Sequence, residues 1–102
     1  MKKFAVKVPK RKIVEFCKRN HVRRLSFFGS ILRDDFSQKS DLDMLVEFEP
    51  DNVPGFFDLI RMEEELSSIF GGRKVDLKTP ADLSRYFRDD VLAEAVGVYV
   101  ES

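Results

Sequence analysis

Two aspartates placed two residues apart are the most chemically distinctive feature of this sequence. Asp41 and Asp43 open an apolar run, and side chains two apart on a strand point to the same face of a sheet. We expect Leu42 and Leu45 to face the opposite side. Two adjacent carboxylates repel each other unless a cation lies between them, and Mg²⁺ takes oxygen ligands while keeping positions for substrate phosphates. The pair therefore predicts metal-assisted chemistry on a phosphate substrate.

A glycine and a serine end the preceding apolar run, and ten residues separate them from the first aspartate of the pair. Gly29 lets the backbone approach a ligand closely, and the amides at the start of a helix after Ser30 would favour a phosphate. Arg33, one turn into that helix, is expected on the same side and could pair with phosphate oxygens. The stretch from 25 to 47 thus predicts strand, turn, short helix, loop and strand.

These residues resemble the nucleotidyltransferase signature of the DNA polymerase β superfamily, Gly-Ser-x-x-Arg-Gly followed by Ser-Asp-x-Asp. The matching residues are Gly29, Ser30, Arg33, Ser40, Asp41 and Asp43. Asp34 departs from the signature, because the family commonly has glycine there, and it puts an extra acid beside the phosphate site. The family has a third carboxylate on a later strand, and Asp76 fits that position. The resemblance covers roughly residues 10 to 100.

The resemblance implies an activity as well as a polymerase β-like fold. Asp41, Asp43 and Asp76 would be the catalytic residues and would hold two Mg²⁺ ions, while Gly29, Ser30, Arg33 and Ser40 would bind the nucleoside triphosphate. The chain has the size of the minimal nucleotidyltransferases, many of which are encoded beside a HEPN-domain ribonuclease toxin. By resemblance, this protein would be an antitoxin that transfers AMP from ATP to a tyrosine of that toxin.

Two other functions remain open at the level of sequence. A degenerate site, for which Asp34 is the only hint in the motif, would leave a binding module that neutralises the toxin by masking its surface. A nucleotidyltransferase acting on a small molecule is equally compatible with the motif. Aromatic residues near the end of the chain are possible contacts with a partner or a base, although such residues usually pack in the core or at its rim; they are Tyr86, Phe87 and Tyr99.

Composition narrows the class of protein. A chain of 102 residues predicts one domain, residues 1–102, and 43% hydrophobic residues suffice for one core. Because 18 basic residues balance 18 acidic ones, the net charge gives no reason to expect nucleic-acid or membrane binding. The basic residues crowd the first 24 positions, a pattern more typical of a solvated helix face than of an RNA contact. A single cysteine, Cys17, and the lack of a signal peptide or long apolar run predict a cytoplasmic protein.

The periodicity of apolar residues predicts the elements that position the site. Amphipathic helices are expected from Pro9 to about His21 and from Pro54 to about Phe70, the second with Phe56, Leu59 and Ile60 among its core positions. Glu63, Glu64 and Glu65 should form a solvated face, and His21 should cap a helix or lie at the surface. Strands are expected at 22–28, 41–48 and 73–78, with short helices from Thr79-Pro80 through 87 and on to 95, and an edge strand at 98–100. This order predicts an α/β (α+β mixed) fold, in which helices pack mainly on one side of a small mixed sheet.

Overall fold

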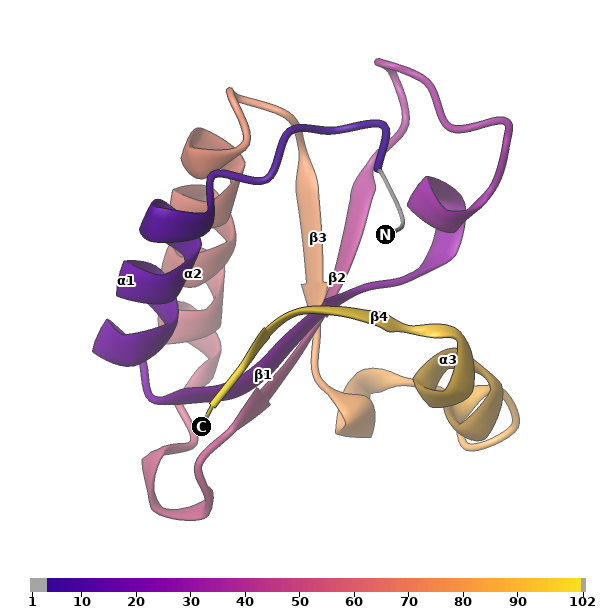
Figure 1. Ribbon diagram of the computed structural model, residues 1–102. Helices are drawn as coiled ribbons and strands as arrows, with labels where there is room; N and C mark the ends of the chain where they lie inside the picture. Colours follow the sequence, from indigo (N-terminus) through magenta and orange to yellow (C-terminus); the bar gives the residue numbers. More distant parts are fainter. Residues whose placement is uncertain (1–3, 102) are drawn as a thin grey trace.

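A four-stranded mixed sheet with helices on both sides forms the framework of the computed structural model, which describes residues 4–101 (Figure 1). The strands lie in the order β3-β2-β1-β4. Strand β1 pairs antiparallel with β2 and β4, and β2 pairs parallel with β3. The mixed fold predicted from the sequence is confirmed.

The elements are α1 (Lys10–Arg19), β1 (Val22–Phe27), β2 (Leu42–Phe48), α2 (Phe56–Ile69), β3 (Val75–Lys78), α3 (Arg88–Glu94) and β4 (Val96–Val100), with 3₁₀ turns at η1 (Gly29–Leu32), η2 (Pro50–Asn52) and η3 (Pro80–Asp82).

The two long helices cover one side of the sheet, as expected. Helices α1 and α2 lie side by side there, whereas the short α3 lies on the other side (Figure 1). The Arg19 guanidinium links the two long helices by donating to both carboxylate oxygens of Glu65 at 3.0 and 2.8 Å. Between these helices and the sheet lies a dry core whose fully buried members include Ile13, Phe16, Leu25, Phe27, Leu42, Met44, Val46 and Leu66.

Residues with a left-handed backbone conformation follow the ends of both long helices. His21 takes a left-handed φ of 56° just beyond α1, lies exposed, and its Nδ1 is 3.2 Å from Oε2 of Glu49, which confirms the surface role. After α2, Gly71 and Gly72 have φ values of 75° and 88°. Only glycine adopts this conformation without strain, so the pair ends the helix and turns the chain back into β3.

The prediction that Leu42 and Leu45 share a face of β2 was wrong, because positions three apart on a strand point to opposite faces. Leu42, Met44 and Val46 face the two long helices as part of the core cluster. Leu45 is also buried, but it lies on the same face as Asp43, where the chain around η3 packs against β2. The site face of the sheet is therefore partly covered at one end.

Several aromatic residues expected to pack are exposed instead. Phe56 and Ile60 of α2 are 73% and 38% exposed, and Tyr86 and Phe87 are 76% and 64% exposed. The helical period placed Phe56 and Ile60 on the apolar stripe, but neither side chain belongs to the core cluster. The helix expected from Pro80 through Phe87 is the single turn η3, held by a capping box between Thr79 and Asp82.

Within residues 4–101, no helix is both long and apolar enough to cross a membrane.

Candidate active site

Asp43 and Asp76 occupy partner positions on the two parallel strands β2 and β3. Side chains at partner positions of neighbouring strands point to the same face of a sheet. Here that face is the one turned away from α1 and α2, because the residues flanking Asp43, Leu42 and Met44, lie in the core. The two predicted catalytic carboxylates are thus brought together from segments 33 residues apart in sequence (76 − 43).

Asp41 lies just before β2, and it has a lysine as its nearest opposite charge. Nζ of Lys74 is 3.8 Å from Oδ2 of Asp41, with both side chains largely exposed. In the same way, Nζ of Lys78 is 3.5 Å from Oδ1 of Asp76. Two ammonium groups therefore offset part of the negative charge of the predicted site.

The backbone of Gly29 lies close to one of these carboxylates, that of Asp43. It follows β1 with a left-handed φ of 72°, and a Cβ built on it would lie 2.4 Å from Oδ2 of Asp43. The neighbouring Phe28 N–H donates to the main-chain carbonyl of Asp43 at 3.1 Å. The glycine predicted to sit beside a ligand thus sits directly against the predicted metal ligand.

Ser30 joins the turn to both aspartates. Its hydroxyl donates to the main-chain carbonyl of Asp41 at 3.2 Å, and its main-chain amide is among the groups that lower the pKa of the Asp43 carboxyl. The expected helix after Ser30 is only the 3₁₀ turn η1, followed by Arg33 in an extended conformation. A single turn carries little macrodipole, so the predicted helix N-terminus for phosphate was wrong. The Ser30 amide and hydroxyl remain as donors.

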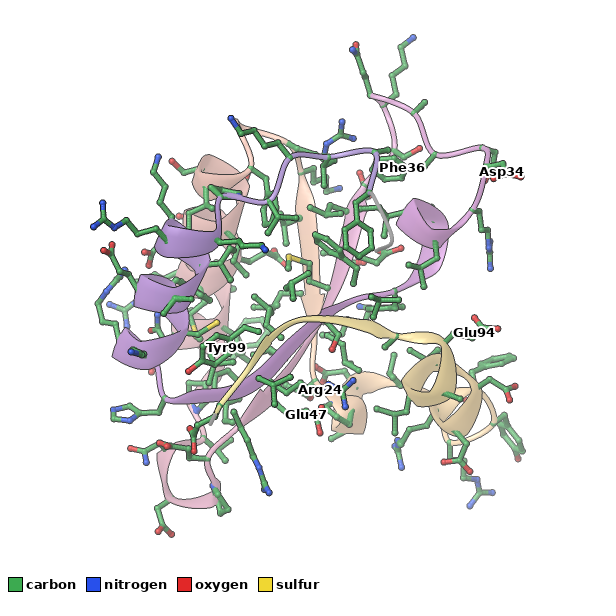
Figure 2. The ribbon with its side chains drawn as sticks, in the orientation of Figure 1. Arg24, Asp34, Phe36, Glu47, Glu94 and Tyr99 are labelled. Carbon is green, nitrogen blue, oxygen red and sulfur yellow. The ribbon has the colours of Figure 1, made fainter. Side chains whose placement is uncertain are left out.

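The other residues of the signature lie in the loop between η1 and β2. Arg33 is exposed and its N–H closes η1 by donating to the Ser30 carbonyl at 2.9 Å. The Ser40 hydroxyl accepts from the Ser37 N–H at 3.0 Å, so it shapes the loop that leads into Asp41. Asp34, the departure from the signature, lies on the outer side of the loop, away from the sheet (Figure 2).

The electrostatics of the site centre on Asp43. Burial raises the pKa of its carboxyl above the ordinary value of 3.8, and the negative charges of Asp76 and Asp41 raise it further. The Ser30 amide and Lys78 act in the opposite direction without cancelling the rise. A nearby cation would therefore stabilise the ionised form of this carboxylate.

Two residues that the sequence did not single out hold the site together. The Arg73 guanidinium donates to the carbonyls of Ser37, Gln38 and Ser40 at 3.0, 3.4 and 3.1 Å, and it lies 4.9 Å from the centre of the Phe36 ring. It thereby fastens the loop before Asp41 to the start of β3. A basic residue directly after the Gly71-Gly72 stop was visible in the sequence, but its partners were not.

Glu63 is the second such residue. Its carboxylate accepts the Leu77 N–H at 2.8 Å, so it holds the outer edge of β3 beside Asp76. The expectation that Glu63, Glu64 and Glu65 form one solvated face was wrong for two of them, because Glu63 bonds β3 and Glu65 bonds α1.

The donor set at the site suits a hard divalent cation, although no closed metal site is preformed. In the part of the chain from 4 to 101, no three His, Cys, Asp or Glu side chains are grouped closely enough to hold a metal as they stand. Carboxylate oxygens are what Mg²⁺ prefers, and the mutual repulsion that raises the pKa of Asp43 is what a cation would relieve. The residues therefore fit Mg²⁺ in chemistry, with Lys74 and Lys78 as the counter-ions that it would replace.

Comparison with known proteins gives the family. Residues 10–98 match the model of the Nucleotidyltransferase domain family. A protein of Methanocaldococcus jannaschii that is provisionally named a protein adenylyltransferase is 37% identical over 89 residues, which is 87% of this chain and 92% of that protein. The protein adenylyltransferase MntA of Thermococcus cleftensis is 37% identical over 84 residues, 82% of each chain.

Solved structures agree with the fold. A structure provisionally described as a minimal nucleotidyltransferase matches with a TM-score of 0.69 at 32% identity, covering 85% of this chain and 86% of that one. A complex of a tri-AMPylated Shewanella oneidensis HEPN toxin with an MNT antitoxin matches in fold, with a TM-score of 0.65 at 18% identity, covering 90% of this chain and 70% of that one. With the family match spanning most of its length, this chain belongs to the Nucleotidyltransferase domain family.

Proposed function

We propose that this protein transfers AMP from ATP, with Mg²⁺, to a hydroxyl of a partner protein, a tyrosine of a HEPN-domain toxin, and thereby acts as an antitoxin. The observation that carries the reaction is the parallel register that pairs Asp43 with Asp76 beside Gly29. The names of the relatives, protein adenylyltransferases, support a protein acceptor, and the HEPN–MNT complex among the structural neighbours supports the class of partner. The reaction would take place in the cytoplasm, within one domain formed by residues 1–102.

Asp41, Asp43 and Asp76 would hold two Mg²⁺ ions. Bound there, the metal would supply charge neutralisation for the attacking and leaving oxygens of an in-line displacement at the α-phosphorus.

Residues of the chain would bind the donor phosphates and accept the proton of the acceptor hydroxyl. The Ser30 amide and hydroxyl, the Arg33 guanidinium and the loop around Ser40 would hold the β- and γ-phosphates. Asp76 would accept the proton of the acceptor hydroxyl as its oxygen bonds to the α-phosphorus. The bond from that phosphorus to the bridging oxygen breaks, and pyrophosphate leaves. Positioning and charge, rather than covalent chemistry, would supply most of the rate.

The geometry does not favour a protein that only masks the toxin and has an inactive nucleotidyltransferase site. Its only motif-level support was Asp34, which lies on the outer side of the loop (Figure 2), whereas Asp43 faces Gly29. A small-molecule acceptor would be revealed by the same experiment.

The test is the intact mass of the product of the adjacent gene after incubation with the protein, Mg²⁺ and each nucleoside triphosphate in turn. A gain of one or more AMP units with ATP, absent in Asp41→Asn plus Asp43→Asn, is expected. A stable complex without any mass change would establish masking instead. Neither a mass change nor a complex would direct the search to small-molecule acceptors.

A further inference from the structure

A groove of about 480 Å³ runs between the start of α2 and the outer edge of β3. Phe56, Leu59 and Ile60 line it from the helix, and Asp76, Leu77 and Lys78 line it from the strand. The groove therefore brings apolar residues of α2 and Asp76 of the candidate active site to one surface.

The order of the strands decides which reactant enters from this side. Gly29 and Ser30 follow β1, Asp43 is on the central β2, and Asp76 is on the edge strand β3. The donor phosphates held at Ser30 and the acceptor at Asp76 thus approach Asp43 from opposite directions. An in-line displacement needs this arrangement, because the attacking and leaving oxygens stand on opposite sides of the phosphorus. The groove lies on the acceptor side.

The chemistry of the lining indicates what the groove would receive. Phe56 is 73% exposed and Ile60 is 38% exposed, and exposed apolar patches with aromatic side chains mark sites of association with other proteins. Besides the proposed metal ligand Asp76 and its partner Lys78, the charged lining consists of Glu63 and Asp82, so the groove favours a segment that carries positive charge. A flat strand addition to β3 is disfavoured, because Glu63 already accepts the outward Leu77 N–H.

We infer that this groove docks the acceptor protein, through a segment that places its hydroxyl residue at Asp76 and an apolar side chain, flanked by basic residues, against Phe56 and Ile60. The inference rests on the proposed function for the identity of the reaction, and it adds the surface that selects the acceptor. The groove gives the acceptor a binding determinant separate from the nucleotide site.

The matched variants are Phe56→Ser plus Ile60→Ser, and Phe57→Ser as control. Phe57 is 78% exposed and adjacent in sequence, but it does not line the groove. All three side chains are outside the core cluster, so the melting temperatures should match that of the unaltered protein. The probe is the product of the adjacent gene, measured first for binding without nucleotide and then as the substrate in the transfer assay.

We expect the double variant to weaken binding of the probe and to raise KM for it by at least tenfold, with KM for ATP unchanged, while Phe57→Ser behaves like the unaltered protein. Equal KM values for the probe in all three proteins would overturn the inference. If the unaltered protein transfers no AMP to the probe, the proposed reaction is wrong. The binding measurements with the probe then test the docking surface by themselves. Loss of probe binding in the double variant alone would support the docking surface. The absence of binding by all three proteins would overturn the inference.

Discussion

Gly29 and Asp43 approach each other so closely that the structure leaves no room for a side chain at position 29. A Cβ there would lie 2.4 Å from Oδ2 of Asp43, and the φ of Gly29 is 72°. Two independent constraints, a left-handed backbone and a carboxylate in van der Waals contact, thus demand glycine at one position. The turn after β1 and the carboxylate on β2 therefore form one unit.

We expect Gly29→Ala to reduce both stability and transfer. The left-handed conformation costs about 1–2 kcal/mol with a Cβ, and the carboxylate must also move, so the free energy of unfolding should fall by roughly 2 kcal/mol. Transfer should fall by about 10²-fold, since displacements near 1 Å at a reacting centre have that effect. Urea unfolding and the mass assay measure the two losses.

Gly55→Ala is the matched control for that substitution. Gly55 has a φ of −78°, and a Cβ there would meet nothing within 4 Å. Its effect on stability should stay within about 0.5 kcal/mol. Equal losses in the two variants would contradict the special position of Gly29.

Asp43→Asn should abolish transfer and yet raise the stability of the metal-free protein. The pKa of Asp43 is raised by burial and by Asp76, so its ionisation at neutral pH opposes folding. The contribution of this group to stability is complete below its ordinary value of 3.8 and is lost as pH rises through the raised value. In EDTA, the variant should therefore melt higher than the unaltered protein at pH 7. The difference should shrink as the pH falls toward the ordinary value.

Mg²⁺ should reverse the order of the melting temperatures of the unaltered protein and Asp43→Asn. A cation bound at Asp43 removes the repulsion and stabilises the folded state by mass action, so the melting temperature of the unaltered protein should rise with Mg²⁺ and that of Asp43→Asn should not. An unchanged melting temperature in both proteins, across millimolar Mg²⁺, would argue against a metal at this position.

The sequence could predict those parts of the site that depend on local rules. The period of two of a strand places Asp43 on the face opposite Leu42 and Met44, although Asp41 lies just before the strand, and Gly29 before a polar turn marks a close backbone approach. Asp76 also lies where the resemblance placed it, because a short β-favouring run after Gly71-Gly72 leaves little choice of element. Asp43 and Asp76 come together once β2 and β3 pair in parallel.

Contacts between residues that are distant in the sequence could not be predicted in the same way. The exposure of Phe56 depends on what packs against it, and the partners of Glu63 and Arg73 lie 14 and 33–36 residues away in the chain. A helical period shows which side chains share a face, but not what stands opposite that face. The residues that hold the site in place therefore emerged only from the structure.

Arg73→Gln should loosen the loop that leads into Asp41. The guanidinium makes three hydrogen bonds to carbonyls of residues 37–40, and a shorter neutral amide cannot span them. We expect the free energy of unfolding to fall by about 1–2 kcal/mol and the Mg²⁺ concentration for half-maximal transfer to rise several-fold. Arg85→Gln, at an exposed position whose guanidinium lies over Tyr86, is the control. If both variants need the same Mg²⁺ as the unaltered protein, the loop does not depend on Arg73.

Glu63 offers a test of whether the edge of β3 must be held for Asp76 to act. Glu63→Ala removes the acceptor of the Leu77 N–H and should cost about 1 kcal/mol of stability, with kcat reduced several-fold and KM for ATP unchanged. Glu63→Gln retains a carbonyl oxygen at the same reach, so it should restore most of the loss. Glu64→Ala, on the exposed side of the same helix turn, should have no effect. Comparable kcat values for Glu63→Ala and Glu64→Ala would show that β3 positions Asp76 without help from α2.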